Sequence, residues 1–467
     1  MDTRKDFQRD AAQGAWIEQA HAVLGGKRYH IETYGCQMNA HDSERLAGLL
    51  QTIGMEQAQG EQDADLILLN TCCVREHAEN RVYGRLGQIA AIKREKPDLL
   101  LGVCGCMMQQ DKAAQKLLSR MRHVNLAFGT HNLHELPQML VEAAAGGKGF
   151  ARVAEGSRDI VEGIPAVRKT SVSAWTTIMY GCDNFCSYCI VPHVRGREKS
   201  REPDVIVAEV RDLAASGVRE ITLLGQNVNS YHGGGLRFPQ LLRRIEEEVP
   251  ELLRLRFMTS HPKDLSDELI EVMAHSRAVC PQIHLPVQSG SDAILERMNR
   301  RYTAAHYLSL LEKLRATVPG IGVSSDIIVG FPGETEEDFQ ATLALVERSR
   351  FNAAFTFKYS RRTGTAAAKM EDQIPDDVKR ERLARLNALQ TRISAELDAQ
   401  AVGSVQPVLF ETVSRRRATQ ISGRTGSGRT VSADGDASLI GSVRNVRITK
   451  SMANTLVGEI ADGEVGD

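Results

Sequence analysis

The chain has 467 residues, of which 42% are hydrophobic, and its 58 Lys and Arg nearly balance its 59 Asp and Glu. This composition is typical of soluble globular proteins, and the length predicts about three domains. No apolar run approaches the ~20 residues that a membrane-spanning helix needs, and no secretory signal opens the chain. We therefore expect a cytoplasmic protein with no membrane role, whose cysteines stay reduced.

A mixed-charge tail covers residues 1–26. Within it, hydrophobic side chains recur at helical spacing, and they are Trp16, Ile17, Ala20, Val23 and Leu24. This spacing predicts one amphipathic helix, to which no function is assigned.

Residues 27–144 alternate short apolar strands with helices, which predicts a doubly wound parallel sheet. The expected strands cover residues 28–34, 65–69 and 99–103, and helices follow from about 43 and 75. Just beyond the three strands lie Cys36, Cys72 and Cys106. Because ligands bind at the carboxyl ends of such strands, these three cysteines are predicted to converge on one edge as a three-thiolate site.

Three further cysteines lie outside any proposed ligand set. Cys73 is expected to face away from the ligand of Cys72, because adjacent residues of an extended chain point to opposite sides. Cys104 shares a face with Cys106 if the strand continues that far, so spacing alone leaves it open as a ligand. We interpret Cys73, Cys104 and Cys280 as small buried hydrophobic residues.

A glycine-rich linker is expected over residues 145–167, followed by six strand–helix units over 168–400. The six strands are predicted at 175–179, 220–224, 253–258, 282–286, 322–329 and 353–359. Their succession without tight hairpins predicts a partial (β/α)6 barrel, which places the loop after the first strand at the carboxyl end, where barrel enzymes carry out their chemistry.

That loop contains Cys182, Cys186 and Cys189 with the spacing C-x3-C-x2-C. Three thiolates on a four-iron cluster leave one iron open for substrate chemistry. A Cys3His zinc site that includes His193 is the alternative, although structural zinc sites are usually built from two separated ligand pairs. The pattern resembles the radical S-adenosylmethionine (SAM) superfamily, in which the open iron binds SAM.

Polar, glycine-rich loops follow other barrel strands and could contact SAM. The candidate SAM-binding residues are Tyr188, Gln226, Asn227, Gln288, Ser289 and Gly330. Residues 335–338 independently predict a helix capping box.

Residues 401–463 are rich in Val, Thr, Ser, Gly and Arg, which predicts a small all-β barrel after a charged helix over about 375–400. We expect its arginines to lie on loops and to bind RNA phosphates, because the guanidinium group is a planar fork of donors. The candidates are Arg415, Arg416, Arg417, Arg424 and Arg429, together with Arg195, Arg197 and Arg201 after the cysteine loop.

The order of these parts over 27–463 resembles the methylthiotransferase family, which has an amino-terminal cluster domain, a radical SAM barrel and a carboxy-terminal TRAM domain. The segments that carry the resemblance to its MiaB branch are Thr33–Asn39, Asp42–Glu44, Asn70–Cys72, Gly105–Cys106, Arg195–Arg201 and Met298–Thr303. The resemblance implies methylthiolation of carbon 2 of N6-isopentenyladenosine next to the anticodon of tRNA. It also implies two 4Fe-4S clusters, one held by each cysteine triad, and two SAM molecules, one a methyl donor and one a source of the 5′-deoxyadenosyl radical.

The implied partners are the tRNA anticodon loop, an electron donor such as flavodoxin or ferredoxin, and an external sulfur source. Catalytic residues other than the cluster ligands are not predicted. Three alternatives stay open: a sister methylthiotransferase acting on threonylcarbamoyladenosine in tRNA or on a ribosomal-protein aspartate, a radical SAM enzyme whose second cluster only relays electrons, and a non-catalytic iron-sulfur or zinc RNA-binding protein.

Overall fold

The structure is a computed structural model. It describes residues 5–7, 11–73, 76–110, 112–154, 160–168, 170–414, 417, 419–452 and 455–464. The chain forms two compact units. The first comprises residues 1–169, 180–183 and 189–199, and the second comprises 170–179, 184–188 and 200–467.

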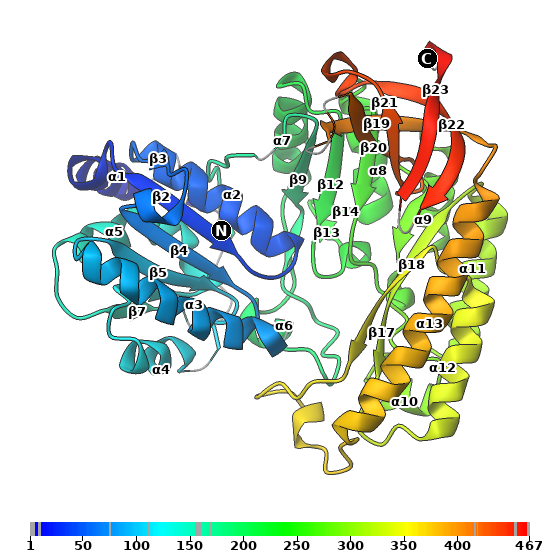
Figure 1. The fold of residues 1–467 in the computed structure, drawn as a ribbon, viewed down its shortest axis with the longest axis horizontal. Coiled ribbons are helices and arrows are strands. Elements are labelled where there is room, and N and C mark those ends of the chain that lie inside the picture. The colour runs from blue at the N-terminus through cyan, green and yellow to red at the C-terminus, as the bar shows by residue number, and fades with distance from the viewer. Residues whose placement is uncertain are drawn as a thin grey trace. The chain divides into compact units, whose positions relative to one another are not determined.

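The first unit contains a six-stranded sheet whose strands pair in the order β3-β2-β4-β5-β6-β7, with every pairing parallel (Figure 1). The strands are β2 (Arg28–Thr33), β3 (Glu56–Gln57), β4 (Leu66–Thr71), β5 (Leu100–Gly105), β6 (Leu126–Phe128) and β7 (Phe150–Arg152). From β2 the chain passes first to β3 on one side and then to β4 on the other. The strand order therefore reverses between β2 and β4, which confirms the doubly wound sheet.

Alternating side chains of the central strands bury both faces of this sheet. On β4, Leu66 and Leu68 belong to one apolar cluster, whereas Ile67 and Leu69 belong to the other. The first face packs on α1 (Ala11–Leu24), α2 (Gln37–Thr52) and α5 (Leu136–Ala144), and the second on α3 (Glu76–Glu95) and α4 (Ala113–Arg120). Burial on both faces explains why these strands are continuous apolar runs.

Three local features differ from or extend the sequence-based expectations. The tail contains the expected helix, α1, in which Ala20 and Leu24 are buried. The first long helix, α2, begins at Gln37, six residues before the expected start, so that Cys36 is its N-cap residue. The range expected to be a linker contains β7, which pairs with β6, and β8 (Val161–Glu162), which pairs with β1 (Lys5–Asp6).

The second unit contains six parallel barrel strands in two three-stranded sheets, ordered β15-β12-β9 and β16-β17-β18. The strands are β9 (Ser173–Thr177), β12 (Glu220–Leu224), β15 (Arg254–Phe257), β16 (Gln282–His284), β17 (Gly322–Val329) and β18 (Ala353–Lys358). The helices of this unit are α7 (Pro203–Ala215), α8 (Phe238–Glu248), α9 (Asp267–His275), α10 (Asp292–Arg297), α11 (Ala304–Thr317), α12 (Glu336–Ser349) and α13 (Asp376–Gln400). These elements confirm the partial barrel.

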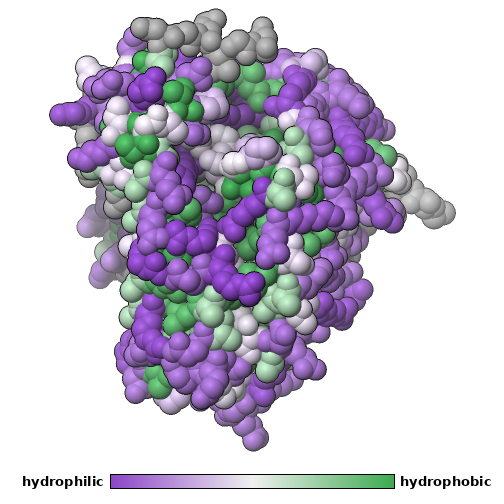
Figure 2. All heavy atoms as spheres, turned by 90° about the vertical axis from the view of Figure 1, so that its right-hand side faces the viewer, coloured by the Kyte–Doolittle hydropathy of each residue, from purple (hydrophilic) through white to green (hydrophobic). Residues whose placement is uncertain are grey.

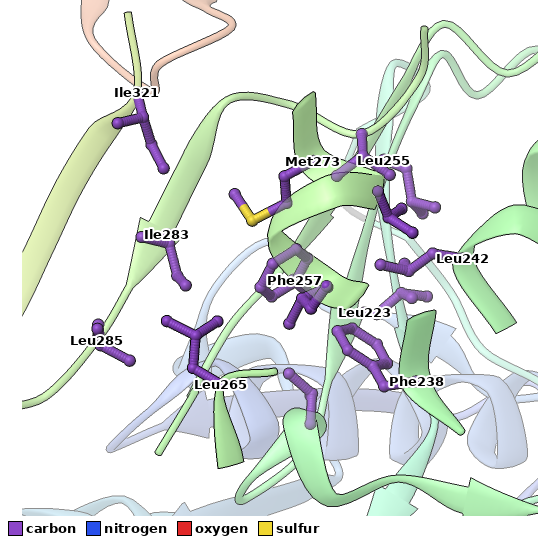
Figure 3. Packing of buried hydrophobic residues seen from close by; sticks show 14 of the residues in the cluster. Leu223, Phe238, Leu242, Leu255, Phe257, Leu265, Met273, Ile283, Leu285 and Ile321 are labelled. Atoms are coloured by element: carbon purple, nitrogen blue, oxygen red, sulfur yellow. The ribbon is translucent and has the colours of Figure 1, made fainter. Parts of the chain in front are cut away.

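The apolar core of this barrel lies between its strands and its helices. Leu223, Leu255 and Phe257 on the strands pack with Phe238 and Leu242 of α8 (Figure 3), and the rings of Phe238 and Phe257 meet edge to face at 5.1 Å. Residues that alternate with the core residues face the other way. Alternate residues of β18 form hydrogen bonds with α13. Phe355 and Phe357 alternate with these residues and therefore point away from the helix, and they are 54% and 41% exposed.

The C-terminal barrel is closed, with strand order β19-β20-β21-β23-β22. Its strands are β19 (Val405–Val413), β20 (Gln420–Thr425), β21 (Thr430–Asp434), β22 (Val443–Met452) and β23 (Thr455–Glu464). Glu220, at the start of β12, is fully buried and joins this barrel to the larger one. Its carboxylate pairs with Arg424 of β20 at 2.6 Å and with Arg256 of β15 at 2.9 Å, and Arg256 also donates to the carbonyl of Thr425 at 2.7 Å.

Hydrophilic residues predominate on the face shown in Figure 2, which is the side of Figure 1 where α11, α12 and α13 lie. Within the part of the chain that the structure describes, no helix combines the length and the apolar composition needed to cross a membrane.

Candidate functional site

Cys36, Cys72 and Cys106, the N-terminal triad, follow three neighbouring strands of the first unit, namely β2, β4 and β5. Two glycines bring the turns close together. Gly35 has φ +124°, and a Cβ atom there would lie 2.5 Å from the Cβ of Cys72. Gly105, at φ +96°, turns the chain so that Cys106 does not continue the alternation of β5. The triad therefore lies at the carboxyl edge, beside the point where the strand order reverses.

Asn39, one turn into α2, connects two of the triad residues. Its Oδ1 accepts from the thiol of Cys36 at 3.8 Å and from that of Cys106 at 3.7 Å, while its Nδ2 donates to the carbonyl of Thr71 at 2.9 Å. Asn39 is fully buried. From the sequence, Asn39 is recognisable only as part of a motif, and its position three residues after Cys36 is the available signal.

Arg195 lies against the same site. It is 6% exposed, forms an ion pair with Asp42 at 2.8 Å and donates to Asn39 Oδ1 at 3.3 Å. Its guanidinium group is thus committed inside the first unit, which does not support the RNA contact expected for it. Together with a hydrogen bond from Cys73, the charge of Arg195 lowers the pKa of Cys106 and favours its thiolate, the form that binds iron.

Cys73 also contacts the triad. Its thiol donates to the sulfur of Cys106, which lowers the pKa of Cys106 and raises that of Cys73. The prediction that Cys73 faces away is therefore wrong, because β4 ends at Thr71 and residue 73 lies in a bend, where strand alternation no longer applies. Cys104, in contrast, packs in the apolar cluster of the first sheet face, which confirms its interpretation as a core residue.

A pocket with an empty volume of about 630 Å³ adjoins the buried Arg195–Asp42 pair within the first unit. Its lining includes the basic side chains of Arg45, Arg197 and Lys199 and the apolar side chains of Leu133, Ile160, Val161 and Ile164. The guanidinium group of Arg45 donates to Tyr180 Oη at 3.1 Å and to the carbonyl of Val161 at 3.2 Å.

The loop with the second triad follows β10 (Met179–Tyr180). Cys182 and Cys189 belong to the first unit and Cys186 to the second. The segment around Cys186 is held by residues that follow α10. Ser187 donates through its backbone N–H to the carbonyl of Met298 at 3.0 Å, and Asn299 Nδ2 donates to the carbonyl of Phe185 at 3.0 Å.

Arg300 places a positive charge beside Cys186. It is 4% exposed, and its Nη1 donates to the sulfur of Cys186 at 3.3 Å. Its other nitrogens donate to the carbonyl of Pro286 at 2.9 Å and to Tyr302 Oη at 2.8 Å, which fixes its orientation. The sequence places Arg300 only within a family motif and does not predict this role.

The carboxyl ends of the barrel strands carry buried polar atoms that have no hydrogen-bond partner among the described residues. They are Gln226 Oε1, Asn229 Oδ1 and Nδ2, Ser260 Oγ, His261 Nε2, Gln288 Oε1, Tyr359 Oη and Ser360 Oγ. Unpaired buried polar atoms are costly, and here they follow four of the six strands. A polar ligand such as SAM fits this set of donors and acceptors, and two of the expected SAM-binding residues, Gln226 and Gln288, belong to it.

The other expected SAM-binding residues are already engaged in contacts. Asn227 donates to Asp264 at 2.7 Å, and Ser289 Oγ lies 3.3 Å from Thr342 Oγ1. Tyr188 is partly buried beside an apolar cluster that includes Phe331 and Tyr359. These positions leave their contact with SAM a prediction.

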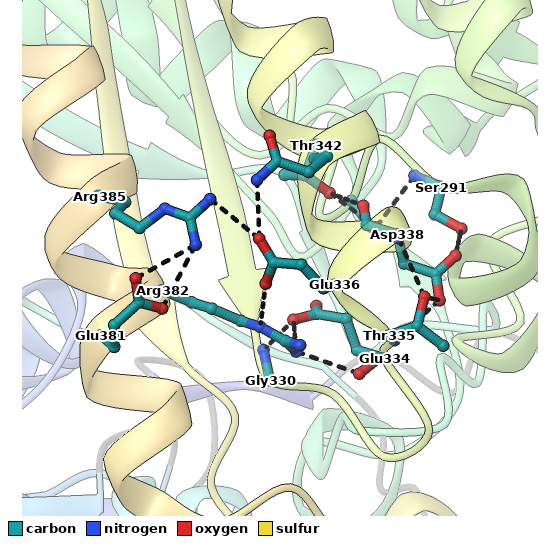
Figure 4. A network of polar contacts seen from close by, with 12 residues as sticks. Ser291, Gly330, Glu334, Thr335, Glu336, Asp338, Thr342, Glu381, Arg382 and Arg385 are labelled. Carbon is teal, nitrogen blue, oxygen red and sulfur yellow. Dashed lines mark hydrogen bonds and ion pairs between the residues drawn. The ribbon is translucent and has the colours of Figure 1, made fainter.

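Gly330 begins a turn after β17 that a polar network holds in place (Figure 4). Its N–H donates to Glu334 Oε1 at 2.8 Å, and the same oxygen accepts from Arg382 of α13 at 2.7 Å. The expected capping box is confirmed, because Thr335 and Asp338 exchange hydrogen bonds at the start of α12.

We expect Gly330→Ala to lower the stability of the chain by at least about 1–2 kcal/mol, the usual cost of left-handed backbone for a residue with a Cβ. Gly330 has φ +68°, and a Cβ there would approach Lys379 Cγ to 2.3 Å. Gly14→Ala is the control, because Gly14 lies inside α1 with nothing within 4 Å of a Cβ atom added there, and it should leave stability equal or raised. Thermal melts of the two variants check this, and equal melting temperatures would contradict the strain at Gly330.

The remaining arginines proposed to bind RNA divide into paired and accessible groups. Arg201 is buried in an ion pair with Glu209, and Arg429 bonds to Asp398 at 3.3 Å. Arg424 lies in β20, not on a loop as expected, and pairs with Glu220 and Glu411. Arg417 is exposed, as is 68% of the side chain of Arg197, which pairs with Asp183. Arg415 and Arg416 lie outside the described residues.

Among the described residues, no three His, Cys, Asp or Glu side chains form a group that could hold a metal ion. The donor chemistry of both triads nevertheless suits iron, since each consists of three cysteines with a buried arginine against at least one of them. The assignment of a cluster to each triad stays a prediction.

His261 makes the stability of the chain depend on pH. Burial, reinforced by the positive charges of Arg300 and Lys263, lowers the pKa of His261 to about 2, whereas an unfolded histidine has a pKa near ~6.5. Below pH ~6.5, His261 binds a proton in the unfolded chain but not in the folded chain. The contribution of the neutral His261 to the free energy of unfolding is therefore complete above pH ~6.5. As the pH falls below this value, the contribution is lost by about 1.4 kcal/mol per pH unit.

We therefore expect His261→Gln to lose less stability than the wild type between pH 7 and pH 5, by about 2 kcal/mol. Urea unfolding of the full chain at the two pH values measures the difference. Parallel losses in the two proteins would show that His261 is protonated in the folded state.

Three family models match the chain. The model of the uncharacterized protein family UPF0004 matches residues 28–129, that of the radical SAM superfamily matches 176–346, and that of the TRAM domain matches 399–461.

Named relatives cover nearly the whole chain. A protein of Thermoanaerobacter sp. (strain X514), named tRNA-2-methylthio-N(6)-dimethylallyladenosine synthase, is 50% identical over 437 residues, which are 93% of each chain. A protein of the same name from Carboxydothermus hydrogenoformans is 50% identical over 439 residues, covering 93% of this chain and 99% of the relative.

A solved structure shares the fold. The radical SAM methyltransferase TsrM from Kitasatospora setae superposes with a TM-score of 0.53 over 82% of this chain and 77% of its own, at 16% identity. With these matches across both units, the chain belongs to the tRNA-2-methylthio-N(6)-dimethylallyladenosine synthase family of the radical SAM superfamily.

Proposed function

We propose that this enzyme attaches a methylthio group to carbon 2 of N6-isopentenyladenosine, also called N6-dimethylallyladenosine, next to the anticodon of tRNA. The observation that carries the proposal is the 50% identity with synthases of that name over 93% of the chain. The two cysteine triads, which follow the carboxyl ends of parallel strands, support it.

The residues that would hold the cofactors follow from the two sites. Cys182, Cys186 and Cys189 would hold the cluster that binds SAM, and the N-terminal triad would hold a second cluster. When bound, these groups would supply the radical that removes hydrogen from carbon 2 and the methylated sulfur that replaces it.

The protein's own residues orient the cysteines of these sites and place positive charge beside them. Arg300 is fixed by Pro286 and Tyr302, so it keeps a positive charge 3.3 Å from the sulfur of Cys186. Asn39 links two sulfurs of the N-terminal triad, and Arg195 supplies positive charge there. At the N-terminal triad this arrangement lowers the pKa of Cys106 and favours its thiolate.

The proposed partners are the tRNA anticodon loop, an electron donor of the flavodoxin or ferredoxin type, and an external sulfur source, all in the cytoplasm. An unpaired loop base can enter an active site at little unstacking cost. Arg197 and Arg417 are the candidates for phosphate contact that remain exposed.

The test is to incubate the anaerobically reconstituted enzyme with isopentenylated tRNA, threonylcarbamoylated tRNA and the ribosomal protein, followed by mass spectrometry of the products. We expect the methylthio group only on the first, and the same nucleoside should be missing from tRNA of cells that lack the gene. Turnover restricted to either of the other substrates would refute the proposal.

A further inference from the structure

His261 follows β15 at the carboxyl end of the radical SAM barrel, and its ring orientation is fixed. Its backbone N–H donates to Asn227 Oδ1 at 3.1 Å, and its Nδ1 accepts from the backbone N–H of Lys263 at 3.3 Å. Because Nδ1 acts as an acceptor, the single proton of the neutral ring resides on Nε2.

That Nε2–H has no acceptor among the described residues, although His261 is only 5% exposed. Leaving a buried donor unsatisfied lowers the stability of the folded chain by about 1–3 kcal/mol. A hydrogen-bond acceptor on a bound ligand would remove this cost.

The unpaired donor of His261 is connected by contacts to the second cysteine triad. The ring of His261 packs edge to face on Tyr302 at 5.6 Å, Tyr302 accepts from Arg300, and Arg300 contacts the sulfur of Cys186. All four residues belong to the second unit, so this chain of contacts does not depend on how the two units are arranged.

Burial, and then the positive charges of Arg300, Lys263 and Arg301, lower the pKa of His261 and oppose its protonation. A neutral ring in this position can act as a hydrogen-bond donor through Nε2. The ring nitrogens of a purine are acceptors that such a donor can bind.

We propose that His261 is a positioning residue that donates its Nε2–H to a ring nitrogen of an adenine bound at the carboxyl end of the barrel. This inference rests on the proposed function, because both SAM and the target nucleoside bring an adenine to this face. The chemistry recognised is the same from either source, and the experiment distinguishes them.

Two variants separate the donor from the rest of the side chain. His261→Asn retains an acceptor at the position of Nδ1 but is too short to place an N–H at the position of Nε2, whereas His261→Gln can carry an N–H there. In the reconstituted holoenzyme, SAM affinity is measured by equilibrium dialysis, and affinity for an isopentenylated anticodon stem-loop by fluorescence anisotropy. Each ligand is also used with single 1-deaza, 3-deaza and 7-deaza replacements in its adenine.

We expect His261→Asn to weaken one of the two ligands about tenfold, the usual worth of one buried hydrogen bond, and His261→Gln to restore most of the loss. One deaza analogue of that ligand should bind the wild type and His261→Asn equally, because its acceptor is already gone. A loss in the SAM arm assigns the bond to SAM, and a loss in the stem-loop arm assigns it to the target adenosine.

Unchanged affinity for both ligands, or equal weakening by Asn and Gln at unchanged melting temperature, would overturn the inference. Failure of the proposed function is read separately, from the absence of a methylthiolated product with the wild-type enzyme. In that event the SAM arm still tests His261.

Discussion

Cys186→Ala is expected to abolish methylthiolation, with a loss of at least about 10³-fold, the scale on which essential catalytic groups act. The remaining two cysteines of its triad cannot hold a cluster with one open iron, and the charge of Arg300 loses its partner at 3.3 Å. Product formation is measured by mass spectrometry of tRNA nucleosides, and 5′-deoxyadenosine is measured in the same reactions.

Cys280→Ala is the matched control, since Cys280 is also buried, belongs to the same unit as Cys186 and lies in neither triad. It should retain activity and lose no more than about 1 kcal/mol of stability. Iron analysis should find roughly four fewer irons per chain in Cys186→Ala than in the control. Methylthiolated product from Cys186→Ala would exclude the triad as the radical site.

Glu220→Ala should be the most destabilising single change that we predict, lowering the free energy of unfolding by about 3–5 kcal/mol. Glu220 is fully buried, and its removal leaves Arg256 and Arg424 with positive charges that no longer face a carboxylate. Because Arg424 belongs to the C-terminal barrel, the loss should loosen the junction between the two barrels.

Glu396→Ala provides the comparison, because its carboxylate forms ion pairs with Arg350 and Arg392 at the surface. Such exposed pairs contribute little to stability. Differential scanning fluorimetry and urea melts of both variants check the contrast, and similar midpoints would show that Glu220 is not a structural anchor. Limited proteolysis of Glu220→Ala should cleave near residue 401 before the rest of the chain.

Much of the fold follows from local sequence patterns. The limits of β12 and β17 match the expected ranges. The expected strand ends also predicted where the three cysteines of the N-terminal triad lie, because the carboxyl ends of parallel strands meet at one edge of a sheet.

What the sequence did not reveal depends on contacts between distant residues. Arg195 and Asn39 are 156 positions apart, and Arg300 and Cys186 are 114 apart, so no local period connects them. Arg424 was expected on a loop between strands, yet strand pairing in the closed barrel places it opposite Leu409. The unpaired nitrogen of His261 was equally hidden, because an unsatisfied donor is recognised only when all its neighbours are known.

The side chains of Phe355 and Phe357 point away from the apolar core between barrel strands and helices and stay exposed. Their contribution to the packing of that core is therefore small. We expect substitutions at these two positions to preserve the melting temperature, so that this side of β18 can vary in sequence without loss of the fold.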